Sequence, residues 1–207
     1  MPYWGRTYAR RADLHDQIKR AVNVNGRVAL VGLPGFGKTH LGSAVSVEMA
    51  DEMPGEAVWL RGDSPDQMIK SIRSELHVRG RPSDFDDARV LREFANLMEK
   101  SPQPLAVLVD DVTDPTLLAR ALPDNLGTPV IATMRRRLVD PTVWMCVTID
   151  ELSDDQAFVL ARAELPPRFT DHDAKQLAEA LVGYPLAIVS AAALLRNHPY
   201  ITIDQFR

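Results

Sequence analysis

RVALVGLPGFGKT, at positions 27–39, joins an apolar run of strand type to a glycine-rich segment. Residues 32–39 fit the pattern G-x-x-x-x-G-K-[ST], in which glycines let the backbone curl so that its N–H groups surround a phosphate. In this pattern Lys38 reaches the β- and γ-phosphate oxygens, and the Thr39 hydroxyl binds Mg²⁺. Residues 40–53 can form the helix whose positive N-terminus faces the phosphates. An accidental glycine-rich turn rarely has both neighbours, so the stretch predicts a nucleotide site in an α/β fold.

The composition of the 207-residue chain is that of a globular protein, with 45% hydrophobic and 25% charged residues. This length suits one large domain, or a domain with a smaller appendage. The net charge of −4 argues against a dedicated nucleic-acid surface, so we expect no direct nucleic-acid binding.

Cys146 is the single cysteine of the sequence, so no internal disulfide can form and we expect a reducing, cytoplasmic location. It lies in an apolar run where a buried strand residue is a simpler interpretation than a nucleophile. The five histidines lack the spacing of zinc ligands. The sequence contains no signal peptide and no apolar stretch long enough to span a bilayer, so no membrane partner is expected.

Residues 105–109 form the most continuous apolar run and are followed by Asp110 and Asp111. A strand that is apolar on both faces belongs inside a parallel sheet, and α/β sheets bind ligands at the carboxyl ends of their strands. Alone, the two acids would suit a solvated turn. Beside an intact phosphate loop they predict the second half of a nucleotide site, with Asp110 holding Mg²⁺ and Asp111 polarising a water molecule.

Strands and helices alternate through the first 150 residues. We expect strands at residues 27–31, 56–60, 105–109, 129–133 and 144–149, and helices at residues 8–22, 40–53, 65–78, 83–100 and 114–121. This order predicts an α/β fold, a three-layer αβα P-loop NTPase with a mostly parallel five-stranded sheet. Three arginines, at positions 135–137, follow the fourth strand. They suit either a solvated turn or a site where an arginine touches the γ-phosphate, and the residues alone leave both open.

From residue 151 the pattern is helical throughout, which predicts a small all-α unit after the sheet. Helix starts are expected at Ser153 and Thr170, where capping residues precede apolar periodic runs, and at Pro185. The predicted organisation is therefore an N-terminal linker and helix (1–26), a nucleotide-binding domain (27–150) and a helical domain (151–207). Because the chain ends inside a helix expected at 202–207, we expect a fragment of a longer protein.

These motifs, taken together and in order, resemble the NB-ARC branch of the STAND signalling ATPases, which are relatives of the AAA+ proteins. Trp4-Gly5-Arg6 is similar to the aromatic-Gly-Arg linker signature that lies beside the adenine. Asp110 and Asp111 match the paired acids of the family, one for Mg²⁺ and one as candidate catalytic base. The family continues with a winged-helix domain, which lies outside these 207 residues.

The resemblance has departures. Pro34 stands where the family has glycine and removes one backbone N–H from the phosphate loop. Thr133-Met134-Arg135 resembles the Thr-Thr-Arg that senses the γ-phosphate, and Arg135 is carried over with more weight than Thr133. Gly183-Tyr184-Pro185 is similar to the start of the Gly-Leu-Pro-Leu-Ala motif, whose proline packs on the adenine. The nucleotide-binding set implied is Trp4, Gly5, Arg6, Gly32, Pro34, Gly35, Phe36, Gly37, Lys38, Thr39, His40 and Pro185.

The resemblance implies an ATP- and ADP-binding switch that requires Mg²⁺. Slow hydrolysis would reset an ADP-bound closed state, and the full-length protein would self-associate in its ATP state. The catalytic residues implied are Lys38, Asp111 and Arg135, and the metal-binding residues are Thr39 and Asp110. Two alternatives stay open: a mechanical AAA+ ATPase, for which the arginines at 135–137 are the argument, and an ADP-locked scaffold that does not hydrolyse ATP.

Overall fold

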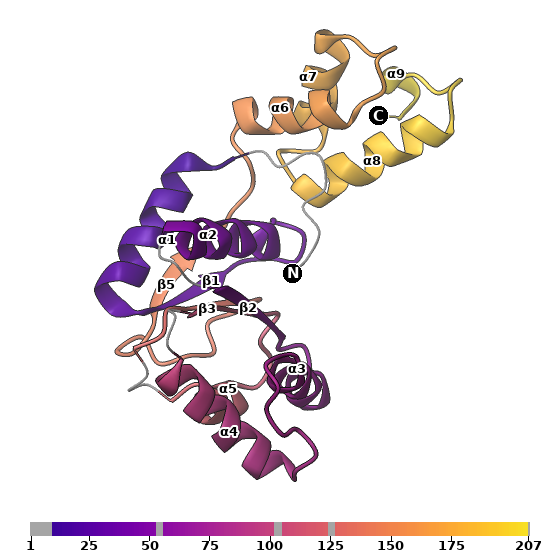
Figure 1. Ribbon diagram of the computed structural model, residues 1–207. Helices are drawn as coiled ribbons and strands as arrows, with labels where there is room; N and C mark the ends of the chain where they lie inside the picture. Colours follow the sequence, from indigo (N-terminus) through magenta and orange to yellow (C-terminus); the bar gives the residue numbers. More distant parts are fainter. Residues whose placement is uncertain (1–9, 53–55, 102–104, 124–126, 207) are drawn as a thin grey trace.

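A computed structural model describes residues 10–52, 56–101, 105–123 and 127–206 of the chain. The elements, shown in Figure 1, follow in this order: α1 (Ala12–Asn25), β1 (Arg27–Val31), α2 (Lys38–Glu52), β2 (Glu56–Arg61), α3 (Pro65–Val78), α4 (Asp87–Lys100), β3 (Leu105–Asp110), α5 (Pro115–Ala121), β4 (Val130–Met134), β5 (Met145–Thr148), α6 (Asp154–Glu164), α7 (Asp171–Ala180), α8 (Pro185–Asn197) and α9 (Ile203–Phe206). The expected alternation of strands and helices, followed by helices, is present.

The sheet has five strands in the order β2-β3-β4-β1-β5, and every pairing is parallel. The predicted α/β three-layer fold is confirmed. β4 lies between β1 and β3, so the carboxyl ends of these three strands meet at one edge of the sheet. This edge therefore brings together the phosphate loop after β1, the acids at the end of β3 and the residues after β4.

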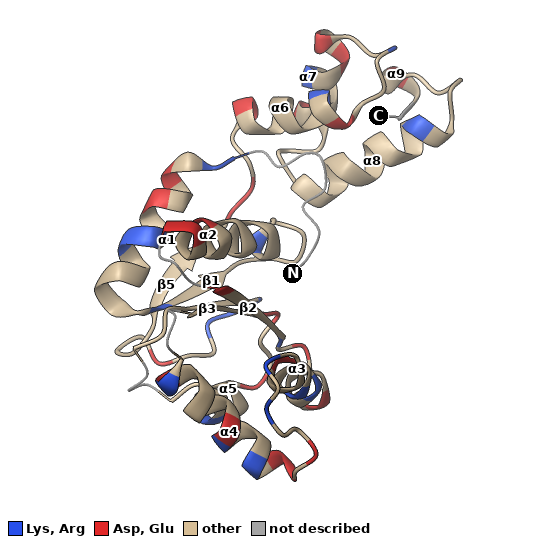
Figure 2. Ribbon diagram, viewed as in Figure 1, with Lys and Arg blue, Asp and Glu red and all other residues tan. Residues whose placement is uncertain are grey.

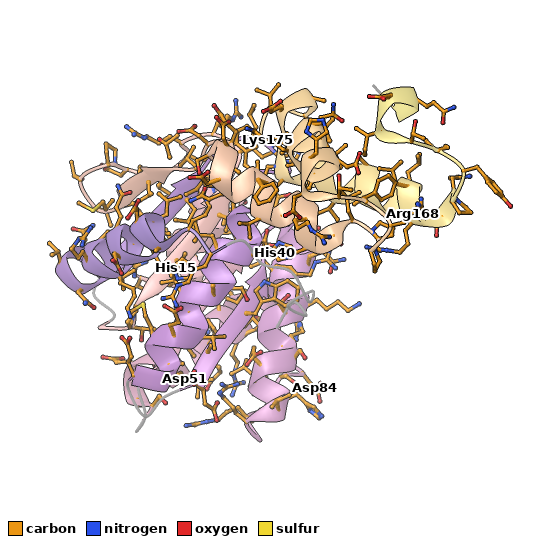
Figure 3. All side chains as sticks on the ribbon, turned by 90° about the horizontal axis from the view of Figure 1, so that it is seen from above. His15, His40, Asp51, Asp84, Arg168 and Lys175 are labelled. Carbon is orange, nitrogen blue, oxygen red and sulfur yellow. The ribbon has the colours of Figure 1, made fainter. Side chains whose placement is uncertain are left out.

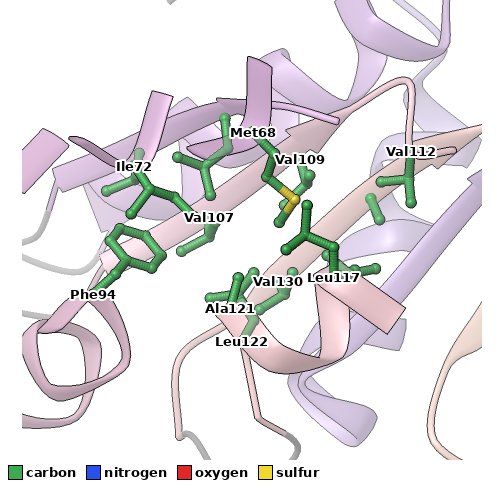
Figure 4. Close-up of a cluster of buried hydrophobic side chains, with 14 of the residues drawn as sticks. Met68, Ile72, Phe94, Val107, Val109, Val112, Leu117, Ala121, Leu122 and Val130 are labelled. Carbon is green, nitrogen blue, oxygen red and sulfur yellow. The ribbon is translucent and has the colours of Figure 1, made fainter. Parts of the chain in front are cut away.

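Alternating side chains of the strands send apolar groups to both faces of the sheet. On one face Leu30, Leu108 and Ile131 pack with residues of α1 and α2. On the other face Val107 and Val130 join a larger cluster with α3, α4 and α5, shown in Figure 4. Burial on both faces explains why the central strands read as continuous apolar runs.

The helices from α6 onward bury an apolar cluster of their own, which includes Leu160, Leu177 and Ile188. Figure 1 shows them gathered beyond α2, on the side of the molecule away from α3–α5. The starts expected at Ser153 and Thr170 are both confirmed as reciprocal capping boxes. Figure 2 shows Lys and Arg interspersed with Asp and Glu along the helices. None of the described helices is long and apolar enough to cross a bilayer.

Several element boundaries differ from the sequence prediction. The helix expected from residue 83 begins at Asp87, because the Asp86 carboxylate caps it by accepting the Arg89 N–H at 2.9 Å. α2 starts at Lys38, two residues early, since the Leu41 N–H already donates to the Gly37 carbonyl. The helix expected to reach residue 183 ends at Ala180. Cys146 lies on β5 as expected but is only half-buried, on an edge strand.

Candidate functional site

The phosphate-loop lysine is almost enclosed by the loop that carries it. Lys38 is 8% exposed, and its Nζ donates to the carbonyls of Gly32 and Leu33, both at 2.8 Å. Burial lowers the pKa of the Lys38 ammonium, and the nearby charges of Asp111 and Asp110 oppose that shift. The loop thus holds a cation beside two carboxylates, in the position that the sequence pattern assigns to a phosphate-binding lysine.

Asp110 accepts hydrogen bonds from two threonine hydroxyl groups at this edge of the sheet. Its Oδ1 accepts from Thr39 Oγ1 and from Thr133 Oγ1, each at 2.7 Å. Thr133 in turn accepts the backbone N–H of Asp111 at 2.8 Å. The ends of β3 and β4 and the start of α2 are therefore joined through one carboxylate oxygen.

The oxygens of Thr39 and Asp110 are the hard donors that Mg²⁺ prefers. Mg²⁺ usually takes one or two protein groups and completes its shell with waters and substrate phosphates. Within the described residues, no group of three or more His, Cys, Asp or Glu side chains forms a metal cage. A two-ligand arrangement fits Mg²⁺ held jointly by protein and nucleotide, so these residues suit the ion.

Asp111 is held in an unusual backbone conformation and is paired with an arginine. Its φ is +53°, in the left-handed region that non-glycine residues seldom occupy. Both carboxylate oxygens accept from Arg135, Oδ1 from Nε at 3.3 Å and Oδ2 from an Nη at 3.0 Å. This hydrogen bond and charge raise the pKa of Arg135. Strain at such a position is a frequent mark of functional residues.

A cleft of about 460 Å³ lies between the phosphate loop and the helices after the sheet. Its loop side carries Gly35, Phe36, Gly37, Lys38, Thr39 and His40. Its opposite side is largely apolar and includes Leu152, Leu160, Pro185, Leu186 and Val189, with Glu164 and Arg11 at polar positions. Figure 3 shows His40 at the end of α2 that faces the helical part, whereas Asp51 lies at the far end.

The helical part touches the phosphate loop directly. The Tyr184 hydroxyl donates to the Pro34 carbonyl at 2.7 Å, and the Leu186 N–H donates to the Gly35 carbonyl at 3.3 Å. The rings of Tyr184 and Phe36 meet edge to face, with centroids 5.5 Å apart. The loop and the start of α8 thus share a contact as well as a cleft.

Most of the predicted site residues that the structure describes lie at this cleft or are linked to it. Asp110, Asp111 and Arg135 lie behind Thr39 at the sheet edge, while Gly32 and Pro34 belong to the loop without lining the cleft. Gly32 lies so close to the residue after β5 that an added Cβ would come within 2.2 Å of the Ile149 carbonyl oxygen. Trp4, Gly5 and Arg6 lie outside the described residues. The functional roles of all these residues stay predictions.

Sequence reasoning missed several residues that line the cleft or contact the phosphate loop. Arg11 donates to the carbonyls of Asp150 and Glu151, at 2.9 and 3.1 Å, and so ties the start of α1 to the connection between sheet and helices. Tyr184 was within a recognised motif, but only its neighbour Pro185 was assigned a role. Leu160 and Val189 follow helical spacing, and Leu160 is itself part of the helical core, so nothing in the sequence marks either as a cleft residue.

Known proteins resemble this chain in fold and, at a lower level, in sequence. No protein-family model matches the sequence. A "nucleotide-binding leucine-rich repeat (NLR)-like protein" of Hyaloscypha variabilis is 26% identical over 205 residues, covering 87% of this chain and 20% of the relative. The chain therefore spans about a fifth of that protein.

Two solved structures have the same fold. Cdc6p from Pyrobaculum aerophilum matches with a TM-score of 0.70 at 15% identity, covering 96% of this chain and 65% of that one. A Signal Transduction ATPase with Numerous Domains (STAND) protein with a tetratricopeptide repeat sensor, from Pyrococcus horikoshii, matches with a TM-score of 0.62 at 20% identity. That match covers 90% of this chain and 30% of the archaeal protein.

Proposed function

We propose that this chain is a P-loop ATPase of the NB-ARC/STAND type and serves as the nucleotide-binding switch module of a signalling protein. The sequence similarity to an NLR-like protein and the fold shared with a STAND protein support this proposal. The observation that carries the proposal is the cleft, which has the phosphate loop on one side and Pro185 with the helices α6 and α8 on the other. A ligand in this cleft contacts both parts. Exchange of that ligand can then bias how the two parts sit together.

The roles follow from the contacts at the sheet edge. Lys38 binds the β- and γ-phosphates of an adenine nucleotide, while Thr39 and Asp110 hold Mg²⁺, which neutralises developing phosphate charge. Asp111 orients the attacking water and accepts its proton as the bond to the leaving ADP oxygen breaks. Arg135 binds the γ-phosphate, for which it must leave Asp111. The apolar side of the cleft, with Pro185, receives the base.

In this proposal ADP stabilises the closed arrangement, and exchange for ATP releases the helical part and allows the full-length protein to self-associate. Slow hydrolysis resets the closed state. A nucleotide shifts the balance only as far as its affinities for the two states differ, so ADP must bind the closed state more tightly than the open one, and ATP must bind the open state more tightly than the closed one.

The first test is to denature the purified protein and identify any released nucleotide by chromatography. We expect ADP, and titration of nucleotide-stripped protein should give saturable binding that requires Mg²⁺. Lys38→Ala should abolish or strongly weaken binding, because it removes the cation enclosed by the loop. Lys70→Ala, on the exposed face of α3, is the matched control. Equal ADP affinity in wild type and Lys38→Ala would show that the site assignment is wrong.

A second function, a scaffold that binds ADP but does not hydrolyse ATP, is favoured by one observation. Both oxygens of Asp111 are engaged by Arg135, which leaves the candidate base occupied. ATP that stays uncleaved for hours with Mg²⁺ present, while bound at the site, would support the scaffold over the hydrolysing switch.

A further inference from the structure

Two successive carbonyl groups of the phosphate loop are bound by the start of α8. Tyr184 donates its hydroxyl to the Pro34 carbonyl, and Leu186 donates its backbone N–H to the Gly35 carbonyl. Neither Tyr184 nor Pro34 lines the cleft, whereas Gly35 does. The Tyr184 contact therefore reaches the loop from outside the cleft lining, at the position where proline replaces the glycine of the resembled family.

The Pro34–Gly35 peptide is the centre of a tight turn. The Phe36 N–H donates to the Leu33 carbonyl at 3.4 Å, and the φ of Gly35 is +82°. Proline at the second position and a left-handed glycine at the third are the signature of a type II turn. A type I turn differs by a flip of this central peptide, so one peptide rotation separates two shapes of the loop.

The Tyr184 hydroxyl distinguishes these two shapes. The C=O and N–H of a trans peptide point in opposite directions. When Tyr184 binds the Pro34 carbonyl, the Gly35 N–H is turned away from Tyr184. A flip of the Pro34–Gly35 peptide would reverse the direction of that N–H and break the hydrogen bond from Tyr184 to the Pro34 carbonyl. The N–H groups of a phosphate loop bind the anion, so the orientation of this peptide affects phosphate affinity.

Tyr184 is itself fixed in place by its neighbours. The Leu152 N–H donates to the Gly183 carbonyl at 2.9 Å, and the φ of Gly183 is +63°. A Cβ on Gly183 would come within 2.3 Å of the Leu152 carbonyl oxygen, so the two backbones touch there. Pro185 then begins α8 with a fixed φ. The backbone on both sides of Tyr184 therefore fixes the residue in a position from which its hydroxyl contacts the loop.

We propose that Tyr184 is a positioning residue for the phosphate loop, holding the Pro34–Gly35 peptide in the orientation that binds phosphate groups. The inference rests on the proposed nucleotide site and adds to it a direct link from the helical part to phosphate affinity. Movement of the helical part away from the loop weakens binding of the phosphates as well as of the base.

The experiment compares Tyr184→Phe with wild type in the full 207-residue chain. The variant keeps the ring that meets Phe36 and removes only the hydroxyl. Affinities for ADP, inorganic pyrophosphate and adenosine are measured by competition against a fluorescent ADP analogue. We expect ADP and pyrophosphate to bind about three- to tenfold more weakly, the worth of one neutral hydrogen bond. Adenosine affinity should stay within about twofold of the wild-type value, since the apolar side of the cleft that receives the base is unchanged.

Tyr200→Phe is the matched control, because Tyr200 belongs to the helical part and is 94% exposed. It should leave all three affinities unchanged. Unchanged ADP affinity in Tyr184→Phe would overturn the inference. Equal weakening of adenosine and ADP would also overturn it, by showing that the hydroxyl only docks the helical part. Failure of the wild type to bind any of the three ligands would instead contradict the proposed function, on which the inference depends.

Discussion

The loop side and the helical side of the cleft are held together by different forces. At the sheet edge, hydrogen bonds and an ion pair join Asp110 and Asp111 to the end of β4 and to α2, and the Lys38 ammonium donates to carbonyls of the loop after β1. The side supplied by α6 and α8 presents apolar side chains and belongs to a separate apolar cluster. Under the proposed function, the sheet edge would bind the phosphates, whereas binding of the base would depend on how the helices dock.

The largest effect should come from removing the candidate base on the sheet side. Asp111→Asn is expected to lower the rate of ATP hydrolysis about 10²- to 10⁴-fold, the usual contribution of general base catalysis. ADP affinity should change little, because phosphate binding belongs to the loop. Single-turnover hydrolysis and ADP titration separate the two quantities. Asp84→Asn, in the exposed loop before α4, is the control, and an equal loss in both variants would contradict the assignment.

The next prediction tests whether the helical side is a separate folding unit. Leu177 is completely buried in the helical cluster, so Leu177→Ala should cost about 2–5 kcal/mol of unfolding free energy. In a Trp4→Phe background the remaining tryptophans, Trp59 and Trp144, report only on the sheet part. We expect urea unfolding followed by circular dichroism to show an early helical transition, while the fluorescence transition stays in place.

Val159→Ala is the control for that measurement, because Val159 is 54% exposed on α6. It should shift neither transition by more than about 0.5 kcal/mol. If Leu177→Ala moves both transitions together, the two sides unfold as one unit and the predicted boundary near residue 150 is not a domain boundary.

A smaller effect is expected at the point where the two sides touch. A Cβ on Gly35 would lie 2.5 Å from the Tyr184 hydroxyl and 2.8 Å from Leu186 Cβ. Gly35→Ala should therefore weaken docking by about 1–3 kcal/mol, in addition to backbone strain, and ADP affinity should fall accordingly. Gly80→Ala carries the same positive-φ strain with nothing within 4 Å of the new Cβ. Matching ADP affinities in the two variants would contradict a docking role for Gly35.

The smallest effect concerns the charge on the sheet side. Burial lowers the pKa of Lys38 in the free protein, and a bound phosphate favours the charged ammonium and raises it again. Between these two pKa values the complex carries more protons than the free protein, so binding takes up protons and ADP affinity falls as pH rises. Calorimetry at alkaline pH in two buffers with different ionisation enthalpies measures the uptake.

Lys38→Arg should remove this proton uptake, because arginine stays charged throughout the accessible range. The stability of the free protein should depend on pH in the opposite direction from ADP affinity, because unfolding returns Lys38 to its ordinary, higher pKa. Stability should therefore rise slightly with pH between the lowered pKa of Lys38 in the folded protein and its ordinary pKa in the unfolded chain. An ADP affinity that is independent of pH in the wild type would show that Lys38 does not contact the phosphates.

The sheet side was largely predictable from sequence because its signals are local. The pattern at 32–39 and the acids after a buried strand indicate positions at the ends of parallel strands, and such ends share one edge of the sheet. The Asp111–Arg135 pair was not predicted, since the resemblance assigned Arg135 to the γ-phosphate. The N-cap residue of α4 could not be predicted from the sequence either. Phe85 packs against the core, and this packing favours Asp86 over Ser83 as the N-cap.

The helical side was much less predictable. The contact between Tyr184 and Pro34 joins residues 150 positions apart and depends on the docking of two units, which no local spacing encodes. Val189 has the same periodicity as residues of the helical core, and Leu160 belongs to that core as well as to the cleft. The sequence contains one signal for this contact, which is the aromatic Tyr184 between Gly183 and the helix-starting Pro185. That pattern indicates a side chain with a fixed position but does not indicate which residue it contacts.

The place of β4 between β1 and β3 fixes the distance between the phosphate loop and the two acids. Neighbouring strands lie about 4.8 Å apart, so the loop strand and the acid strand are two strand spacings from one another. Asp110 bridges this gap, because its Oδ1 accepts from Thr133 on β4 and from Thr39 at the start of α2. Thr133 also accepts the Asp111 N–H. Because side chains alternate along a strand, a slip of β4 by one residue would replace the Thr133 hydroxyl with the thioether of Met134. The two motifs that define the site therefore cannot be transplanted as a pair: the strand between them has to come with them, in register.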